Sequence, residues 1–208
     1  MMVYGTINPA ILPHEGNILR SIVGAMKAGK FRRRTHLWIR LHPQVVKGVY
    51  SKNLGPFEDL AGPDVTVEKP PVQSDKLAWD LPKEDATHLA ELLGAADVVA
   101  TPSSTLVIDA ACAGTPIVDV LFDGDGPFEP RVRVARLAKY THYAQILTTG
   151  GIAIARSIEE FVRLVEAYAE DPKRDEARRQ EMIRQQLGCL DGQAGVRTAE
   201  AILKLAGG

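Results

Sequence analysis

Short apolar runs alternate along the chain with longer segments in which apolar residues recur every three or four positions. The run from Leu37 to Leu41 is almost continuously apolar, as expected of a strand that is covered on both faces. Strands that alternate with helices favour a parallel sheet, so we predict an α/β fold, a Rossmann-like three-layer αβα domain with about six strands. The predicted strands are residues 3–6, 36–41, 65–68, 97–101, 116–122 and 152–155.

The helical segments carry start and stop signals. Gly29 and Gly114 each follow a helical pattern and can end it, and Ser157 with Glu160 forms a capping box. Proline and polar residues fill positions 69–83, which we expect to form a surface loop. The predicted helices are residues 15–28, 106–113, 158–170, 173–187 and 193–206, and the last has Ala199, Ile202, Leu203 and Leu205 available for packing.

Composition and charge limit the classes of function. The 208 residues suffice for one domain, and we expect residues 1–208 to form it, with helices at 157–206 packing on it or extending it. A formal net charge of -1 gives no sign of a nucleic-acid or membrane partner. The N-terminus lacks the pattern of a signal peptide, and no window is long enough for a transmembrane segment. We therefore expect a soluble, cytoplasmic protein.

Cysteine and basic residues add little to this picture. Cys112 lies in an apolar helix, where a buried small residue is expected, and no Cys/His group has metal-ligand spacing. The basic cluster "KFRRR", residues 30–34, falls between a predicted helix and a predicted strand. A solvated helix C-terminus explains this cluster better than a phosphate or acidic-lipid patch does.

Four polar clusters follow predicted strands or open predicted helices. In doubly wound folds such loops meet at the carboxyl edge of the sheet, where ligands bind. We expect these clusters to gather there and to contact the phosphates and ribose of a nucleotide. The clusters are Gly5 and Thr6; Arg40, His42 and Pro43; Ser103, Ser104 and Thr105 with Asp109; and Asp191, Gly192 and Arg197.

The third cluster has a definite expected geometry. Ser103, Ser104 and Thr105 stand where a helix begins, so their hydroxyls and backbone N–H groups can face a phosphate. Asp109 lies one turn deeper and can accept hydrogen bonds from a ribose diol. The alternative is a purely local role, in which a hydroxyl caps the helix and Asp109 forms a salt bridge.

His42 and Arg197 are the charged candidates. Pro43 ends the strand and holds His42 at the edge of the sheet, where it can serve as an acid, a base or a donor to phosphate. A packed or capping histidine is the alternative. Arg197 stands one turn into the last helix, where the dipole opposes it, so it needs either an anionic ligand or an internal partner such as Asp191 or Glu200.

In their order along the chain, these motifs resemble the C-terminal half of a GT-B glycosyltransferase. The likeness is to CDP-glycerol glycerophosphotransferases and related capsule or teichoic-acid polymer transferases. It rests on "RLHP", on "ADVVATPSSTLVIDAACAGTPIV" and on "DGQAGVR", and it covers most of residues 3–206. The turn "TPSST" stands where that group has Ser-Asp-Tyr-Ser-Ser, which leaves the donor open between CDP-glycerol and a UDP- or GDP-sugar.

The resemblance implies that the chain binds a nucleotide-diphosphate donor as its substrate, without a further cofactor or metal. His42 and Arg197 would then stabilise or protonate the leaving nucleoside diphosphate. It also implies that the acceptor binds to a second Rossmann-like domain or subunit. Two other functions stay open: a catalytically silent nucleotide-binding or regulatory module, and a sugar-nucleotide 2-epimerase-like domain.

Overall fold

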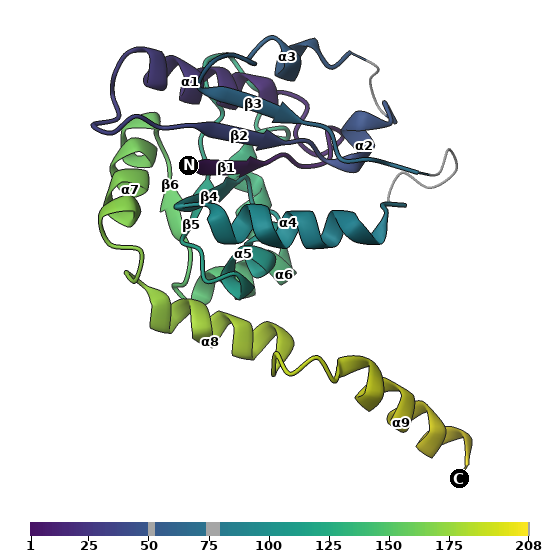
Figure 1. Cartoon of the computed structure of the whole chain (residues 1–208). Helices are drawn as coiled ribbons and strands as arrows, with labels where there is room; N and C mark the ends of the chain where they lie inside the picture. Colours follow the sequence, from purple (N-terminus) through teal and green to yellow (C-terminus); the bar gives the residue numbers. More distant parts are fainter. Residues whose placement is uncertain (50–52, 74–79, 208) are drawn as a thin grey trace.

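Six parallel strands form one sheet in a computed structural model that describes residues 1–49, 53–73 and 80–207 (Figure 1). The strand order is β3-β2-β1-β4-β5-β6, so the chain works outward from β1 to β3, then crosses to β4 on the other side of β1. All six strands were predicted from the sequence, and the α/β class is confirmed. The strands are β1 (Met2–Gly5), β2 (Leu37–Arg40), β3 (Val65–Glu68), β4 (Val98–Thr101), β5 (Ile117–Val120) and β6 (Ala153–Ala155).

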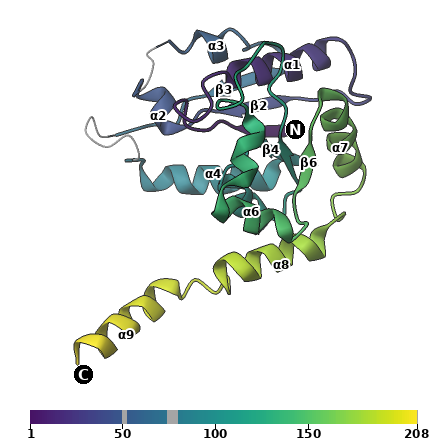
Figure 2. The ribbon, with the colours of Figure 1, turned by 180° about the vertical axis from the view of Figure 1, so that it is seen from behind.

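Helices cover both faces of this sheet (Figures 1 and 2). One face carries α1, α3 and α7 together with the 3-10 segment η1, and the other carries α4, α5, α6 and α8. A short helix, α2, follows β2. The bounds are α1 (Glu15–Lys27), α2 (Pro43–Val46), α3 (Gly55–Glu58), α4 (Lys83–Ala95), α5 (Leu106–Cys112), η1 (Val134–Lys139), α6 (Thr141–Thr148), α7 (Ile158–Glu170), α8 (Glu176–Leu187) and α9 (Ala194–Ala206).

The core has two parts, one on each face of the sheet. Alternate strand residues divide between them: Tyr4 packs toward α1 and α7, while Val3 packs toward α4 and α5. Both residues are fully buried, because a parallel sheet with helices on each side hides both faces of its central strands. The small residues Ala110 and Ala111 are also fully buried, which lets α5 approach the sheet closely as its composition predicts.

Three helices, α2, α3 and α6, and the 3-10 segment η1 were not predicted from the sequence. The helix α4 was also not predicted, although Pro82 and the acidic first turn of α4 are ordinary start signals and Leu92 and Leu93 form its buried stripe. Cys112 is exposed, so its predicted burial is wrong, because it lies on the solvent side of α5. In the predicted loop 69–83, residues 69–73 and 80–82 lie outside helices and strands, and Lys83 begins α4. Residues 74–79 fall outside the described part.

The C-terminal helices differ in their packing. The capping box is present, because the Ser157 hydroxyl accepts a hydrogen bond from the Glu160 N–H, and α7 packs on the sheet. α8 packs on α5, whereas α9 extends away from the domain (Figures 1 and 2) and buries none of its residues. The apolar side chains of Ile202, Leu203 and Leu205 are therefore exposed instead of packed.

No helix in the ranges that the structure describes combines the length and the apolar character needed to cross a membrane.

Candidate functional site

A cleft of about 210 Å³ opens at the carboxyl edge of the sheet, between the ends of β1, β2 and β4. This is the point where the strand order reverses, because β1 connects outward to β2 on one side while β4 lies on its other side. In open α/β sheets the loops separate at such a switch point and leave a crevice for ligands. Lining residues of the cleft are Gly5, Thr6, Arg40, Leu41, His42, Pro43, Leu81, Asp85, Leu89, Ser104, Thr105, Leu106 and Asp109.

Eight residues of the predicted clusters therefore meet in one cleft. They come from three clusters that are far apart in the chain, and parallel strand ends bring them together. They are Gly5, Thr6, Arg40, His42, Pro43, Ser104, Thr105 and Asp109.

Thr6 ties the end of β1 to the end of β2. Its N–H donates to the Arg40 carbonyl at 3.0 Å, and its hydroxyl accepts from the His42 N–H at 2.8 Å. These two bonds extend the ladder past the regular strands and fix the backbone of His42. Thr6 is thus a positioning residue for the histidine as well as part of the cleft wall.

His42 stands as the N-cap of α2, with Pro43 as the first helical residue. Its Nδ1 accepts a hydrogen bond from the Gln44 N–H at 3.2 Å, which assigns the proton of a neutral ring to Nε2. Partial burial lowers the pKa of the imidazole to about 4. At neutral pH the ring is therefore uncharged, which favours a hydrogen-bond donor over a cation. The capping role, which the sequence left open, is present in the structure.

Gly5 is explained by packing. A Cβ at this position would overlap Cδ2 of Leu106, the first residue of α5. The Gly5 carbonyl also accepts a hydrogen bond from the Thr101 hydroxyl at 2.8 Å. The glycine therefore lets α5 begin directly against the end of β1, and this contact forms the floor of the cleft.

Arg40 is held by two carboxylates. Its guanidinium donates to both Asp85 oxygens at 2.6 and 2.7 Å and also binds Glu68. Arg40 and Asp85 are both buried, so breaking their pair would leave an uncompensated charge. This network joins β2, β3 and α4. Sequence reasoning found Arg40 but missed both of its partners, because they come from separate segments of the chain.

Ser103 faces a carboxylate that sequence reasoning did not identify. Asp119 on β5 accepts from the Ser103 N–H at 2.6 Å and from its hydroxyl at 3.2 Å. Ser103 itself has a positive φ of 50°, which the Asp119 bonds hold in place. Ser103 is absent from the lining of the cleft, so its contribution there is to shape the turn before Ser104.

Burial of Asp119 has a clear electrostatic consequence. Its side chain is fully buried, and burial raises the pKa of the carboxyl to about 7, although the Ser103 hydrogen bonds lower it. The Tyr143 hydroxyl lies close by, where it makes no hydrogen bond of good geometry with any described residue. A polar residue inside an apolar strand, "IVDV", was the available signal for Asp119.

Ser104 and Thr105 lead into α5. The Ser104 hydroxyl accepts a hydrogen bond from the Leu106 N–H at 3.3 Å, whereas Thr105, the N-cap residue of α5, makes no side-chain capping hydrogen bond. Within the described residues, the N–H groups of Ser104 and Thr105 donate to no protein acceptor, so both remain for water or a ligand. Asp109 is exposed, yet the surrounding atoms desolvate its carboxyl enough to raise its pKa.

The fourth predicted cluster does not reach the cleft. Asp191 and Gly192 lie in the connection between α8 and α9, and Arg197 lies in the first turns of α9, all of them exposed. Arg197 pairs with Asp191 at 2.7 Å, which is the internal partner that the sequence left open. The predicted position at the sheet edge is wrong, because α9 extends away from the domain, and in this structure these residues contribute nothing to the cleft.

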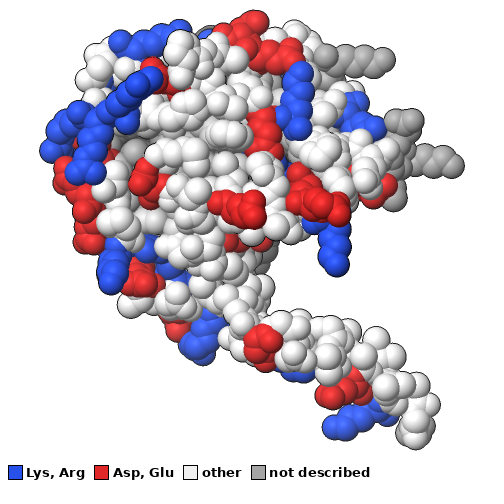
Figure 3. Space-filling model, in the orientation of Figure 1, with Lys and Arg blue, Asp and Glu red and all other residues white. Residues whose placement is uncertain are grey.

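The cleft as a whole offers uncharged or charge-balanced donors and one carboxylate acceptor. The donors are backbone N–H groups and the neutral His42 ring, Asp109 is an acceptor, and the Arg40 charge is balanced by carboxylates. Acidic side chains dominate the neighbouring surface of α4 (Figure 3). Across the described ranges, no three or more His, Cys, Asp or Glu side chains are grouped so as to hold a metal ion.

These features define the chain as a Rossmann-like αβα domain that matches one half of a GT-B fold. No protein-family model and no curated protein matches the sequence. A similar solved structure is the C-terminal CMP-Kdo binding domain of WaaA from Acinetobacter baumannii, with a TM-score of 0.50 and 13% identity over 88% of this chain and 89% of that one. At this identity the likeness shows the fold alone.

A second similar structure is the glycotransferase of kitacinnamycin, with a TM-score of 0.43 and 16% identity. The match covers 88% of this chain but 38% of that protein. This chain therefore spans well under half of that neighbour.

Proposed function

We propose that this domain binds the nucleotide part of an activated donor for a GT-B glycosyltransferase or glycerophosphotransferase. One observation carries the proposal: a cleft at the topological switch point of a 3-2-1-4-5-6 sheet, in which Thr6, His42, Ser104 and Asp109 converge from separate segments. The similarity to a domain that binds CMP-Kdo supports it. The donor is then a CMP-, CDP-, UDP- or GDP-activated compound, and the sequence motifs leave CDP-glycerol and a UDP- or GDP-sugar open.

The residues have distinct roles in this proposal. The N–H groups of Ser104 and Thr105 would donate to a phosphate, and Asp109 would accept from the ribose hydroxyls. His42 would donate from Nε2 to a phosphate oxygen, which stabilises the charge that develops on the leaving nucleotide without a covalent intermediate. Gly5, Thr6, Ser103 and Arg40 would shape the cleft. We propose that the acceptor binds to a second Rossmann-like domain or subunit.

Titration calorimetry with CMP, CDP, UDP and GDP tests this function. Saturable binding of at least one nucleotide is expected, and Asp109→Ala should weaken it strongly. Asp125→Ala, an exposed carboxylate outside the cleft, is the matched control and should bind as the unaltered chain does. If none of the four nucleotides binds, the proposal is wrong.

His42→Ala separates the ligand role from the capping role. Loss of one hydrogen bond to a charged phosphate should weaken nucleotide binding by about tenfold. His42→Asn retains a side-chain acceptor for the Gln44 N–H, so it should keep the cap while losing the ring. Weakened binding in both variants supports a ligand contact, whereas lower stability with unchanged binding would make His42 purely structural.

A further inference from the structure

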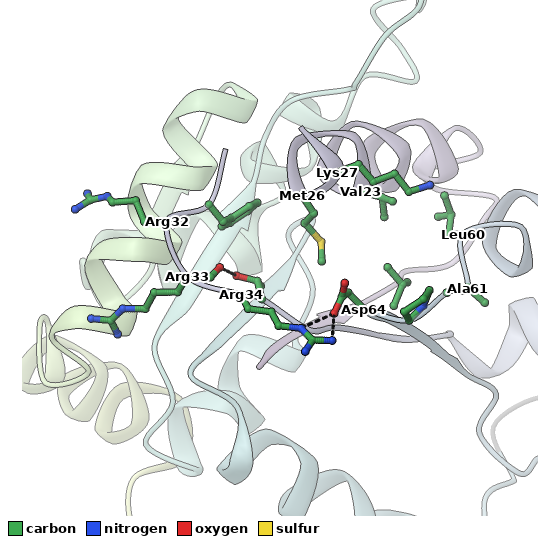
Figure 4. Close-up of a pocket in the computed structure, with 14 residues that line it drawn as sticks. Val23, Met26, Lys27, Arg32, Arg33, Arg34, Leu60, Ala61 and Asp64 are labelled. Carbon is green, nitrogen blue, oxygen red and sulfur yellow. Dashed lines mark hydrogen bonds and ion pairs between the residues drawn. The ribbon is translucent and has the colours of Figure 1, made fainter. Parts of the chain in front are cut away.

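A second cavity, of about 350 Å³, opens at the amino-terminal edge of the sheet, opposite the candidate cleft. Three segments enclose it: the last turns of α1, residues 31–35 ahead of β2, and residues 60–65 ahead of β3 (Figure 4). Pockets for small molecules begin at about 300 Å³, so the cavity is large enough to hold one. Residues 31–34 of the basic cluster, which the proposed function leaves unused, form part of its wall.

The interior of the cavity is apolar. Val23 and Met26 project into it from α1, and Leu60 and Ala61 face them from the opposite side (Figure 4). Val23 is buried in the core, whereas Met26 and Leu60 are only partly buried and pack against that core. A ligand with an aliphatic part would cover these exposed apolar atoms, which is favourable because they now face water.

Some of the charged side chains that line the cavity pair with carboxylates, and others do not. Arg34 and Asp64 form an ion pair at 2.9 Å along its edge, and Arg34 keeps further N–H donors. Arg32 and Arg33 point away toward α7 (Figure 4), where Arg32 binds Glu166. Among the described residues Lys27 has no carboxylate partner. Lys27 therefore places a positive charge without a carboxylate partner beside the apolar interior, whereas Arg33, which donates to the Ala169 carbonyl, points away from it.

Basic side chains gather on the surface at this end of the molecule (Figure 3), and carboxylates pair with Lys30, Arg32 and Arg34 among them. We propose that the cavity binds a small amphiphilic monoanion, a compound with an aliphatic chain and one carboxylate or phosphate group. The chain would lie between Met26 and Leu60, and the anion would contact the Lys27 ammonium and the outer N–H groups of Arg34. The site is separate from the nucleotide cleft and does not depend on the proposed function.

The competing explanation of Lys27 is a helix C-terminus. A lysine in the last turn of α1 is favoured by the helix dipole without any ligand. That role predicts a small loss of stability on substitution and no ligand. Lys30 lies in the same basic segment, pairs with Glu159 and does not line the cavity, so it is a matched control.

Octanoate is a suitable probe. Its binding can be monitored by NMR of methionine methyl groups labelled with carbon-13. The chain has four methionines, of which Met26 lines the cavity and Met182 is buried on the other face of the sheet. Octanoate should shift the Met26 signal saturably and leave Met182 in place. Lys27→Gln should weaken binding by about tenfold, the loss of one charge-assisted hydrogen bond, and Leu60→Trp, which fills the cavity, should abolish it. Lys30→Gln should bind normally.

The source of the anion is distinguished by a second arm. If the ligand is a membrane lipid, the protein should sediment with vesicles that contain phosphatidylglycerol. This co-sedimentation should be lost in Lys27→Gln. Octanoate binding without vesicle binding assigns the site to a free amphiphile. The proposal is overturned if octanoate causes no saturable Met26 shift, or if Lys27→Gln and Lys30→Gln bind it equally.

Discussion

The substitution Asp119→Asn gives the most direct test of the electrostatics beneath the candidate cleft. Asparagine keeps an oxygen for the Ser103 N–H and has nearly the same shape, but it cannot ionise. The pKa of Asp119 is about 7, compared with 3.8 for an unperturbed aspartic acid. At 1.36 kcal/mol per pKa unit, burial disfavours its charged form by roughly 4 kcal/mol.

The sign of the pH effect follows from proton binding. Between the two pKa values the folded state holds a proton on Asp119 that the unfolded chain has released, so the free energy of unfolding falls as pH rises. From about pH 5 to pH 8 this single group lowers stability by about 2.5 kcal/mol. His42 acts in the opposite direction, because its pKa is lowered in the folded state, whereas burial raises the pKa of Glu15, which acts in the same direction as Asp119. The pH dependence of the unaltered protein alone therefore does not isolate Asp119.

The difference in the free energy of unfolding between Asp119→Asn and the unaltered chain isolates the contribution of Asp119. Urea unfolding of both at about pH 5 and pH 8 should show the variant gaining about 2.5 kcal/mol relative to the unaltered chain between these pH values. Asp125→Asn changes an exposed carboxylate and should show no such gain. An Asp119→Asn difference that is the same at both pH values would show that Asp119 titrates normally and that burial does not dominate its environment.

Four further outcomes test the structure. Gly5→Ala should cost about 1–3 kcal/mol of stability in thermal unfolding, because its Cβ would overlap Leu106, and the cost should shrink in a Leu106→Ala background. Ser157→Ala should cost about 1 kcal/mol by loss of the α7 cap, measured by urea unfolding, and an unchanged stability would contradict the observed cap. Removal of residues 191–208 should change the unfolding free energy by less than about 0.5 kcal/mol, since α9 buries nothing; a larger loss would place α9 against the domain. Nucleotide affinity should stay nearly constant from about pH 6 to pH 8 if His42 donates as a neutral ring, whereas a steady fall would show that it binds as a cation.

The sequence by itself determined the sheet and five helices, α1, α5, α7, α8 and α9. Apolar runs such as the one ending at Leu41 are typical of strands covered on both faces, and this local pattern survives folding because burial on both sides is what a parallel sheet requires. The capping box at Ser157 is equally local, since both partners lie within one turn. Strand ends also predicted that Thr6, His42 and Ser104 would meet, because parallel strands place their carboxyl ends at one edge.

Only the tertiary structure decided what these residues do there. Arg40 is paired with Asp85 and Glu68, which come from two other segments of the chain. No sequence spacing relates these three residues. The pKa of Asp119 and the neutrality of His42 depend on burial, which the surrounding elements create together. The course of α9 likewise follows from its lack of tertiary contacts, since an amphipathic pattern shows that a helix has an apolar face but not which surface covers it.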